Sequence, residues 1–279
     1  MKDGFIRVAA ATPDIHVADP QYNSEQIIEL MEQGSARGVK VMAFPELCLT
    51  AYTCSDLFLQ ESLLREAKKE LKRILQASKS KDMILFVGMP WMHKGKLYNV
   101  AAVLNRGRIL GIVPKKHLPN YSEFYELRHF NPGMEKVEMT DWEGVQVPMG
   151  MNLLFACRTM PELVLAAELC EDVWVPCPPS ISHALAGATV IANCSASDET
   201  TGKDQYRYNL ICGQSARLVC GYIYANAGEG ESSQDLVFGG QNIIAENGTC
   251  LVQSDRFKNA CICADLDLGR IISERRRMT

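Results

Sequence analysis

The chain has 279 residues, 47% of them hydrophobic, which is enough apolar material for one large domain or two small ones. Its formal net charge of −4 and pI near 5.8 argue against a nucleic-acid-binding surface. No run of 18 or more apolar residues occurs, which argues against a membrane-spanning helix. The first twenty residues meet polar side chains too early for a signal peptide.

The first half of the chain shows strand and helix patterns in alternation. Strands are expected at 5–11, 39–44 and 83–88, with helices from Asn23 to Gly38 and from about Asp56 onward. Asn23, with Gln26 three residues later, resembles a capping box, and Gly38 suits a left-handed helix end. Residues 97–104 and 108–113 are expected to pair as a hairpin across a turn that ends in Gly107.

An irregular, aromatic stretch at 114–133 then interrupts the pattern, and loops of this length are often functional. Further strands are expected at 151–155, before Cys170, and at 190–194, 222–227, 241–244, 251–253 and 260–265, with helices from Pro178 and over 203–219. Asn247-Gly248 is a strong hairpin signal. We expect a single α/β domain over 1–279 with mixed sheets. The charged end at 273–279 begins like an uncompleted helix, as in a piece cut from a longer chain.

Eleven cysteines without a secretory signal indicate a reducing compartment, which we expect to be the cytoplasm. No C-x-x-C occurs, and the five histidines complete no zinc-ligand spacing, so we expect no metal site. Most of the cysteines are expected to be small core residues.

Three polar residues directly follow apolar strands, and strand ends are where separate segments converge on a site in layered sheet folds. They are Glu46 in VMAFPE, Lys115 in ILGIVPK and Cys170 in LVLAAELC. A thiolate is a nucleophile, and a neighbouring ammonium lowers the pKa of a thiol. Lys115 can supply that charge and bind an oxyanion, while Glu46 can exchange protons with the thiol, the leaving ammonia and water.

Each of these residues also has an interpretation without function. Cys170 can be a packed core cysteine, Glu46 a loop carboxylate and Lys115 part of a solvated turn. A cysteine protease would need a paired histidine, for which only His117 and His183 are candidates. Amide chemistry by Glu46, Lys115 and Cys170 therefore depends on whether the fold brings them together.

The three motifs FPELCLTAYTCSDLF, VPKKHLPNYSEFYE and ELCEDVW resemble the Glu–Lys–Cys triad of the nitrilase superfamily. NCSASDETTGK and DLVFGGQNIIAENG further resemble the amidase domain of glutamine-dependent NAD+ synthetases, and the resemblance covers essentially the whole chain. It implies a four-layer αββα sandwich and hydrolysis of L-glutamine to glutamate and ammonia.

In that family the ammonia passes to a C-terminal synthetase domain that amidates nicotinic acid adenine dinucleotide. No pyrophosphate loop of the Ser-Gly-Gly-x-Asp-Ser type occurs, so we expect that domain to be absent from this chain. ATP, Mg²⁺ and the dinucleotide would then belong to the absent domain, and this chain would need no cofactor. The resemblance also implies a homo-oligomer.

Matched position by position, the resemblance implies Glu46 as general base, Lys115 as oxyanion-stabilising lysine and Cys170 as nucleophile. Lys115 is chosen over Lys116 because the family lysine stands two residues before a His-Leu pair. Glu126 would orient the lysine. The glutamine pocket would be lined by Tyr52, Tyr121, Glu171, Trp174, Ser197 and Lys203. Glu171 would bind the substrate's α-ammonium and Lys203 its α-carboxylate, although some relatives have arginine at the latter position.

Two other functions stay open from the sequence. One is another nitrilase-type carbon-nitrogen hydrolase, such as an ω-amidase or a carbamoylase. The other is a non-catalytic scaffold for oligomerisation around a synthetase. The presence of Glu46, Lys115 and Cys170 at their motif positions favours an enzyme over a scaffold.

Overall fold

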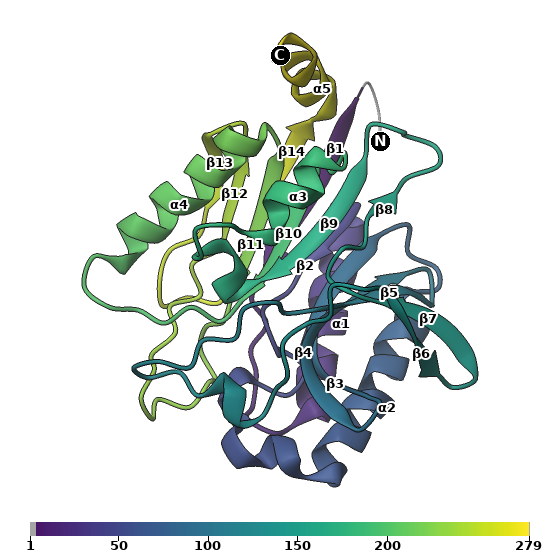
Figure 1. Ribbon diagram of the computed structural model, residues 1–279, viewed down its shortest axis with the longest axis vertical. Helices are drawn as coiled ribbons and strands as arrows, with labels where there is room; N and C mark the ends of the chain where they lie inside the picture. Colours follow the sequence, from purple (N-terminus) through teal and green to yellow (C-terminus); the bar gives the residue numbers. More distant parts are fainter. Residues whose placement is uncertain (1–3, 279) are drawn as a thin grey trace.

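The computed structural model describes residues 4–278, which form two mixed β-sheets packed face to face (Figure 1). The first sheet contains, in spatial order, β14 (Cys261–Asp267), β1 (Phe5–Ala11), β2 (Val41–Ala43), β3 (Ile84–His93), β4 (Lys96–Asn105), β5 (Arg108–Pro114), β7 (Val145–Met149) and β6 (Glu138–Trp142). The second contains β13 (Thr249–Gln253), β12 (Ile243–Glu246), β11 (Gly221–Asn226), β10 (Val190–Ser195), β9 (Val164–Leu169) and β8 (Phe155–Ala156).

Helices cover the outer face of each sheet. Figure 1 shows α1 (Pro20–Ala36) and α2 (Glu61–Ser78) on one side and α3 (Pro179–Leu185) and α4 (Lys203–Leu218) on the other. The last helix, α5 (Leu268–Arg277), follows β14, and short 3₁₀ segments lie at η1 (Tyr52–Leu59), η2 (Glu126–Arg128) and η3 (Cys170–Val173). The arrangement is the expected four-layer αββα sandwich, and no helix among residues 4–278 is long and apolar enough to cross a membrane.

Three apolar layers hold these elements together, because side chains of a strand alternate between its two faces. In β1, Ala9 and Ala11 pack toward α1 and α2, whereas Val8 and Ala10 face the second sheet. In β10, Ala192 belongs to the layer between the sheets. Of the ten cysteines besides Cys170, five are buried, four are partly buried and Cys177 is exposed, so half of them, and not most, are core residues.

Most of the predicted elements are confirmed, including the β4–β5 hairpin and the irregular stretch after β5. Gly38 has a φ of +77°, as expected for the end of a helix. Asn247 and Gly248 both have positive φ in the tight turn between β12 and β13, which confirms the predicted hairpin.

The capping box predicted at Asn23 is wrong. α1 begins one turn earlier, at Pro20, where the Asp19 side chain accepts a hydrogen bond from the backbone N–H of Tyr22. Asn23 is buried inside the helix, where its amide binds backbone groups of His16 and Leu49. A polar side chain near a helix start can form hydrogen bonds with the backbone of a neighbouring loop instead of the backbone of the helix. The sequence pattern is the same in both cases.

Other boundaries also differ from the prediction. α2 begins at Glu61, because the preceding residues form η1 and Gln60 is extended. β3 continues to His93, and the strand predicted at 151–155 is reduced to the short β8. Sequence reasoning missed the β6–β7 hairpin, whose half-exposed edge strands lack a continuous apolar run. The predicted terminal helix begins earlier, at Leu268, and Thr279 lies outside the described residues.

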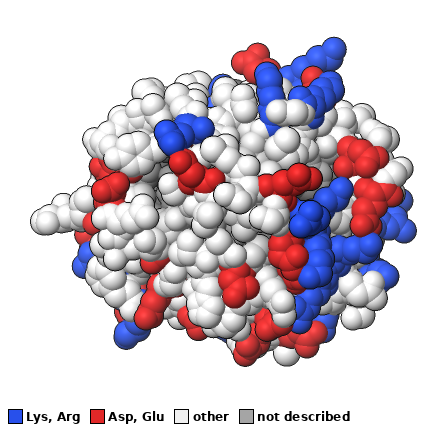
Figure 2. Space-filling model, turned by 90° about the horizontal axis from the view of Figure 1, so that it is seen from below, with Lys and Arg blue, Asp and Glu red and all other residues white. Residues whose placement is uncertain are grey.

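Basic side chains gather on the side of the molecule where α2 lies, with acidic side chains interspersed among them (Figure 2). On α2, Lys69 pairs with Glu66 and Arg73 pairs with Glu25. Exposed pairs of this kind contribute about 0–1 kcal/mol each. The charged side chains of α2 therefore keep its outer face hydrated and contribute little to the stability of the fold.

Gly88 lies in β3 and packs against the turn that follows β2, where there is no room for a side chain. A Cβ at Gly88 would lie 2.2 Å from the carbonyl oxygen of Pro45 and 2.4 Å from the backbone nitrogen of Leu47. Because backbone atoms cannot rotate away, Gly88→Ala should destabilise the protein by about 1–3 kcal/mol, measured by urea unfolding. Gly213→Ala, on the exposed face of α4 with open space at the Cβ, should be neutral or stabilising by up to about 1 kcal/mol. Equal effects of the two changes would contradict this assignment.

Candidate active site

The three predicted strand-end residues come from both sheets. Glu46 follows β2 across Phe44 and Pro45, and Lys115 is the first residue after β5, both in the first sheet. Cys170 is the first residue after β9 in the second sheet. All three side chains are buried, and the exposed fractions of Glu46 and Lys115 are 0%.

Lys115 lies between two carboxylates. Its Nζ donates to Glu46 Oε1 at 2.6 Å and to Glu126 Oε1 at 2.5 Å. Glu46 is held from the second sheet as well, because the backbone N–H of Ala196 donates to its Oε2 at 3.1 Å. Glu126, at the start of η2, accepts a further hydrogen bond from the Tyr52 hydroxyl at 2.8 Å. The structure therefore brings Glu46, Lys115 and the predicted orienting residue Glu126 into one buried cluster.

The charges of this cluster follow from its burial. Desolvation lowers the pKa of Lys115, but the carboxylates of Glu126 and Glu46 outweigh it and raise the pKa well above its ordinary value, so the ammonium stays protonated. Desolvation raises the pKa of Glu126 to about 7, with Lys115 opposing and Glu46 adding to the shift. Near neutral pH, Glu126 is therefore partly protonated.

Cys170 stands on a tight bend. Its φ is +36°, a left-handed value that a non-glycine residue holds at a cost of about 1–3 kcal/mol. Its backbone N–H donates to Asn193 Oδ1 at 3.1 Å. The buried carboxylate of Asp172 accepts from the N–H of Leu169 at 3.0 Å and from that of His117 at 2.8 Å. Asp172 thus ties the segment after Lys115 to the bend that carries the cysteine.

Lys115 lowers the pKa of the Cys170 thiol, as expected, but this effect is outweighed. Burial, followed by the charge of Glu46, raises the pKa of the thiol, and the opposing effect of Lys115 is smaller. The resting cysteine is therefore a neutral thiol. Because the charge of Glu46 acts on that thiol, this carboxylate is the candidate proton acceptor.

Sequence reasoning missed Asn99 in β4. Its Nδ2 donates to Glu46 Oε1 at 2.6 Å and lies 3.4 Å from Glu126 Oε2, and its backbone carbonyl oxygen accepts from the backbone N–H of Lys115. Asn99 is 1% exposed and stands in an otherwise apolar strand. That isolated asparagine in YNVAAVL was the one available signal, because a buried polar side chain needs partners.

A pocket of about 410 Å³ opens beside Cys170, and it contains most of the predicted substrate-binding residues. The residues lining it include Cys170, Tyr121, Phe124, Glu171, Trp174, Ser197, Asp198, Lys203 and Tyr206. Lys115 and Glu46 have no exposed surface, so the sulfur is the part of the cluster that a molecule in this pocket can reach first.

Glu171 and Lys203 are the predicted charged residues of this pocket. The Tyr121 hydroxyl donates to the Glu171 carboxylate at 3.0 Å, and burial raises the pKa of that carboxyl group. Lys203, at the start of α4, is paired with Asp198, and its Nζ lies 5.4 Å from the centre of the Trp174 ring. The pocket is therefore lined by a carboxylate and by a cation that already has a partner.

Ser197 lies at the base of the pocket and is held by a buried arginine that sequence reasoning missed. Arg207, on α4, donates to Glu199 and Gln241 at 2.6 Å each and to the carbonyl oxygen of Asp198 at 2.8 Å. Its Nη2 lies 3.3 Å from Ser197 Oγ. The amphipathic pattern of α4 gave Arg207 the appearance of an ordinary helix residue.

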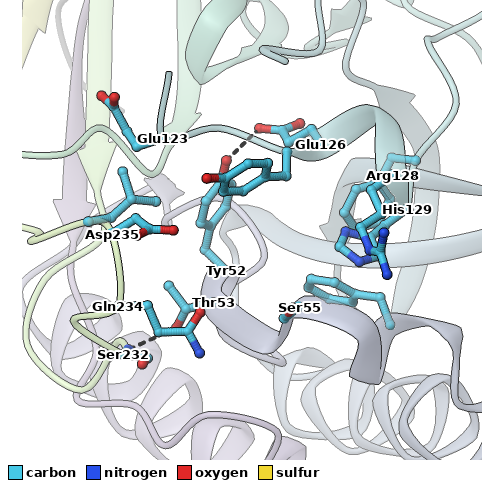
Figure 3. Close-up of a pocket in the computed structure, with 14 residues that line it drawn as sticks. Tyr52, Thr53, Ser55, Glu123, Glu126, Arg128, His129, Ser232, Gln234 and Asp235 are labelled. Atoms are coloured by element: carbon cyan, nitrogen blue, oxygen red, sulfur yellow. Dashed lines mark hydrogen bonds between the residues drawn. The ribbon is translucent and has the colours of Figure 1, made fainter. Parts of the chain in front are cut away.

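Tyr52 lies elsewhere than predicted. It lines a second pocket of about 230 Å³, where Figure 3 shows its hydroxyl bonded to Glu126. The structure does not place Tyr52 among the residues that line the Cys170 pocket. Tyr52 contacts the charged cluster through Glu126, so its predicted contact with substrate has no support from the lining of the Cys170 pocket.

Among residues 4–278, no group of three or more His, Cys, Asp or Glu side chains is arranged to hold a metal ion. The side chains of the site itself are a neutral thiol, an ammonium and the two carboxylates that bind the ammonium.

Comparison with known proteins agrees with this geometry. A family model described as carbon-nitrogen hydrolase matches residues 7–276. A glutamine-dependent NAD(+) synthetase of Mycobacterium tuberculosis is 42% identical over 277 residues, which are 99% of this chain and 41% of the relative. The chain thus spans about two fifths of the length of this curated relative.

Solved structures show the same fold. A glutamine-dependent NAD(+) synthetase from Cytophaga hutchinsonii is similar with a TM-score of 0.84 and 29% identity, over 94% of this chain and 43% of that one. An amidase of the nitrilase superfamily from Nesterenkonia AN1 is similar with a TM-score of 0.76 and 20% identity, over 99% of this chain and 96% of that one; at this identity the likeness shows the fold alone. These matches confirm the resemblance found in the sequence, and the chain belongs to the carbon-nitrogen hydrolase family.

Proposed function

We propose that this chain hydrolyses L-glutamine to glutamate and ammonia through a thioester on Cys170. The observation that carries the proposal is the buried cluster in which Lys115 bridges Glu46 and Glu126 behind a cysteine that faces a pocket. The similarity of the chain to glutamine-dependent NAD(+) synthetases supports glutamine as the substrate.

In the first half of the reaction, Glu46 accepts the proton of the Cys170 thiol while the sulfur attacks the amide carbon. The Lys115 ammonium stabilises the oxyanion, and such a donor is worth roughly 10²–10³ in rate. Because the Cys170 N–H already binds Asn193, the N–H of Glu171 is the backbone donor that we assign to the oxyanion. The proton on Glu46 then passes to the departing nitrogen, which leaves as ammonia.

In the second half, Glu46 takes a proton from water, and the resulting hydroxide attacks the thioester carbon. The carbon–sulfur bond breaks, glutamate leaves, and the sulfur regains the proton from Glu46. Glu126 keeps Lys115 in place through both halves. Each step uses side chains of this chain, which we therefore propose to need no cofactor.

The pocket supports recognition of an amino acid. The Glu171 carboxylate suits an α-ammonium, and Lys203 suits an α-carboxylate once that group replaces Asp198 as its partner. Tyr121, Trp174 and Ser197 complete the walls.

We further propose that the ammonia serves a synthetase domain outside this chain, which makes NAD+ from nicotinic acid adenine dinucleotide. The relative of which this chain spans 41% supports that partner. ATP, Mg²⁺ and the dinucleotide are then assigned to the synthetase domain. We also propose that the chain forms a single domain, acts in the cytoplasm and assembles as a homo-oligomer.

Covalent labelling tests the nucleophile directly, without depending on turnover by a separate domain. A diazo-ketone glutamine analogue should add its mass to the peptide that carries Cys170, as measured by mass spectrometry. Cys170→Ala should abolish both labelling and ammonia release, whereas the exposed Cys177→Ala should keep both. Labelling at another residue, or equal loss in both variants, would contradict the assignment.

A panel of amides tests the substrate. Because the pocket offers charged partners for both α-groups, kcat/KM for L-glutamine should exceed that for aliphatic amides, which lack those groups, and that for L-asparagine, which is one methylene shorter. One methylene alone changes kcat/KM by about 10–200-fold. A preference for simple amides or carbamoyl compounds would identify an ω-amidase or carbamoylase instead.

The pKa of Glu126 predicts a pH dependence. Below about pH 7 this carboxylate is protonated and no longer balances Lys115, so kcat/KM should fall with a midpoint near 7. In Glu126→Gln the maximum should drop by about 10–100-fold through misplacement of Lys115, and the acid limb should move to lower pH. Glu32→Gln, on the exposed surface of α1, should leave the profile unchanged. An acid limb that stays near 7 in Glu126→Gln would show that another group titrates.

A further inference from the structure

Three buried polar residues lie on the face of the second sheet that otherwise packs its apolar side chains against α3 and α4. Glu168 (β9), Asn193 (β10) and Tyr222 (β11) lie on adjacent strands, and Asn193 stands opposite Glu168 in the register. Their exposed fractions are 1%, 0% and 0%. Burying a carboxylate and an amide in such a layer is unfavourable unless every polar group finds a partner.

We propose that Glu168, Tyr222 and Asn193 form a directed chain of hydrogen bonds that holds the backbone of Cys170 in its left-handed conformation. They are thus positioning residues for the nucleophile. This inference rests on the proposed role of Cys170 and extends it to groups that do not line the Cys170 pocket.

The contacts run without a break from α3 to the cysteine. The N–H of Ser180 donates to Glu168 Oε2 at 2.8 Å, and the Tyr222 hydroxyl donates to Glu168 Oε1. Asn193 Nδ2 donates to the Tyr222 oxygen at 3.2 Å, and the N–H of Cys170 donates to Asn193 Oδ1 at 3.1 Å.

The direction of the chain is set at Glu168. Both oxygens of this carboxylate accept hydrogen bonds, so the Tyr222 hydroxyl points toward Glu168 and presents its lone pairs to Asn193. The amide of Asn193 must then turn its NH₂ group to Tyr222 and its oxygen to Cys170. An amide in the opposite orientation would place a donor against the N–H of Cys170, so Glu168, acting through Tyr222, and the N–H of Cys170 require the same orientation of the Asn193 amide.

Glu168→Gln tests this direction with almost no change of shape. The glutamine oxygen is needed by the N–H of Ser180, so its NH₂ faces Tyr222, the hydroxyl turns to Asn193, and the Asn193 amide flips. We expect kcat for glutamine hydrolysis to fall by about 10–100-fold, because a small displacement of the reacting atom is costly. KM should change by less than about threefold, since the pocket walls are untouched.

Glu70→Gln is the matched control. Glu70 is 3% exposed and accepts a hydroxyl hydrogen bond from Ser24 at 2.6 Å, but it lies on α2, across the first sheet from the second one. This change should lower the urea midpoint while kcat stays near the wild-type value. A similar loss of kcat in both variants would reduce the role of Glu168 to stability and overturn the proposal.

Tyr222→Phe provides a second variant and a coupling test. Without the hydroxyl, Glu168 is disconnected from Asn193, so adding Glu168→Gln to Tyr222→Phe should cause no further loss of kcat. Losses that multiply, or wild-type kcat in Glu168→Gln, would overturn the proposal.

Iodoacetamide gives a readout that does not need glutamine. The rate of Cys170 alkylation relative to exposed Cys177 in the same sample should fall in Glu168→Gln and stay constant in Glu70→Gln. Wild-type protein that is alkylated at Cys170 but does not hydrolyse glutamine would contradict the proposed function. The alkylation ratio would still test the chain of hydrogen bonds in that case. An unchanged ratio in Glu168→Gln would contradict the chain itself.

Discussion

The ammonium of Lys115 has no contact with solvent, and the site depends on how that charge is balanced. An isolated charge in a protein interior is costly, and removing one partner of a buried ion pair typically costs about 3–5 kcal/mol. Two carboxylates, Glu46 and Glu126, face the same nitrogen. These contacts hold the end of β2 and the start of η2 around the end of β5.

The second constraint is the bend at Cys170. A strand that ended in ordinary extended backbone would continue past the site, whereas the left-handed cysteine starts η3 at once and turns its sulfur to the pocket. Asp172 binds backbone N–H groups on both sides of the site, and Asn193 takes the N–H of the cysteine itself. The strain of the bend is offset by hydrogen bonds from within the second sheet.

The thiol illustrates where local reasoning about charge fails. A lysine near a cysteine is expected to lower its pKa, but here the same lysine is shared by two carboxylates and the whole cluster is dry. Burial and Glu46 then dominate. In the mechanism that we propose, the thiolate therefore forms by proton transfer to Glu46 during the reaction and is not present at rest.

The sequence by itself determined the strands that end in Glu46, Lys115 and Cys170, the layered α/β class and the family, because apolar periodicity and motif residues are local properties. It did not determine the start of α1, the β6–β7 hairpin or the position of Tyr52, where polar and half-exposed residues satisfy several local patterns. Only the tertiary structure decided that the ends of two different sheets meet, since that depends on how the sheets stack. Asn99, Asn193 and Glu168 belong to the same class: each is a buried polar residue in a mostly apolar strand, and its partner lies on another segment of the chain.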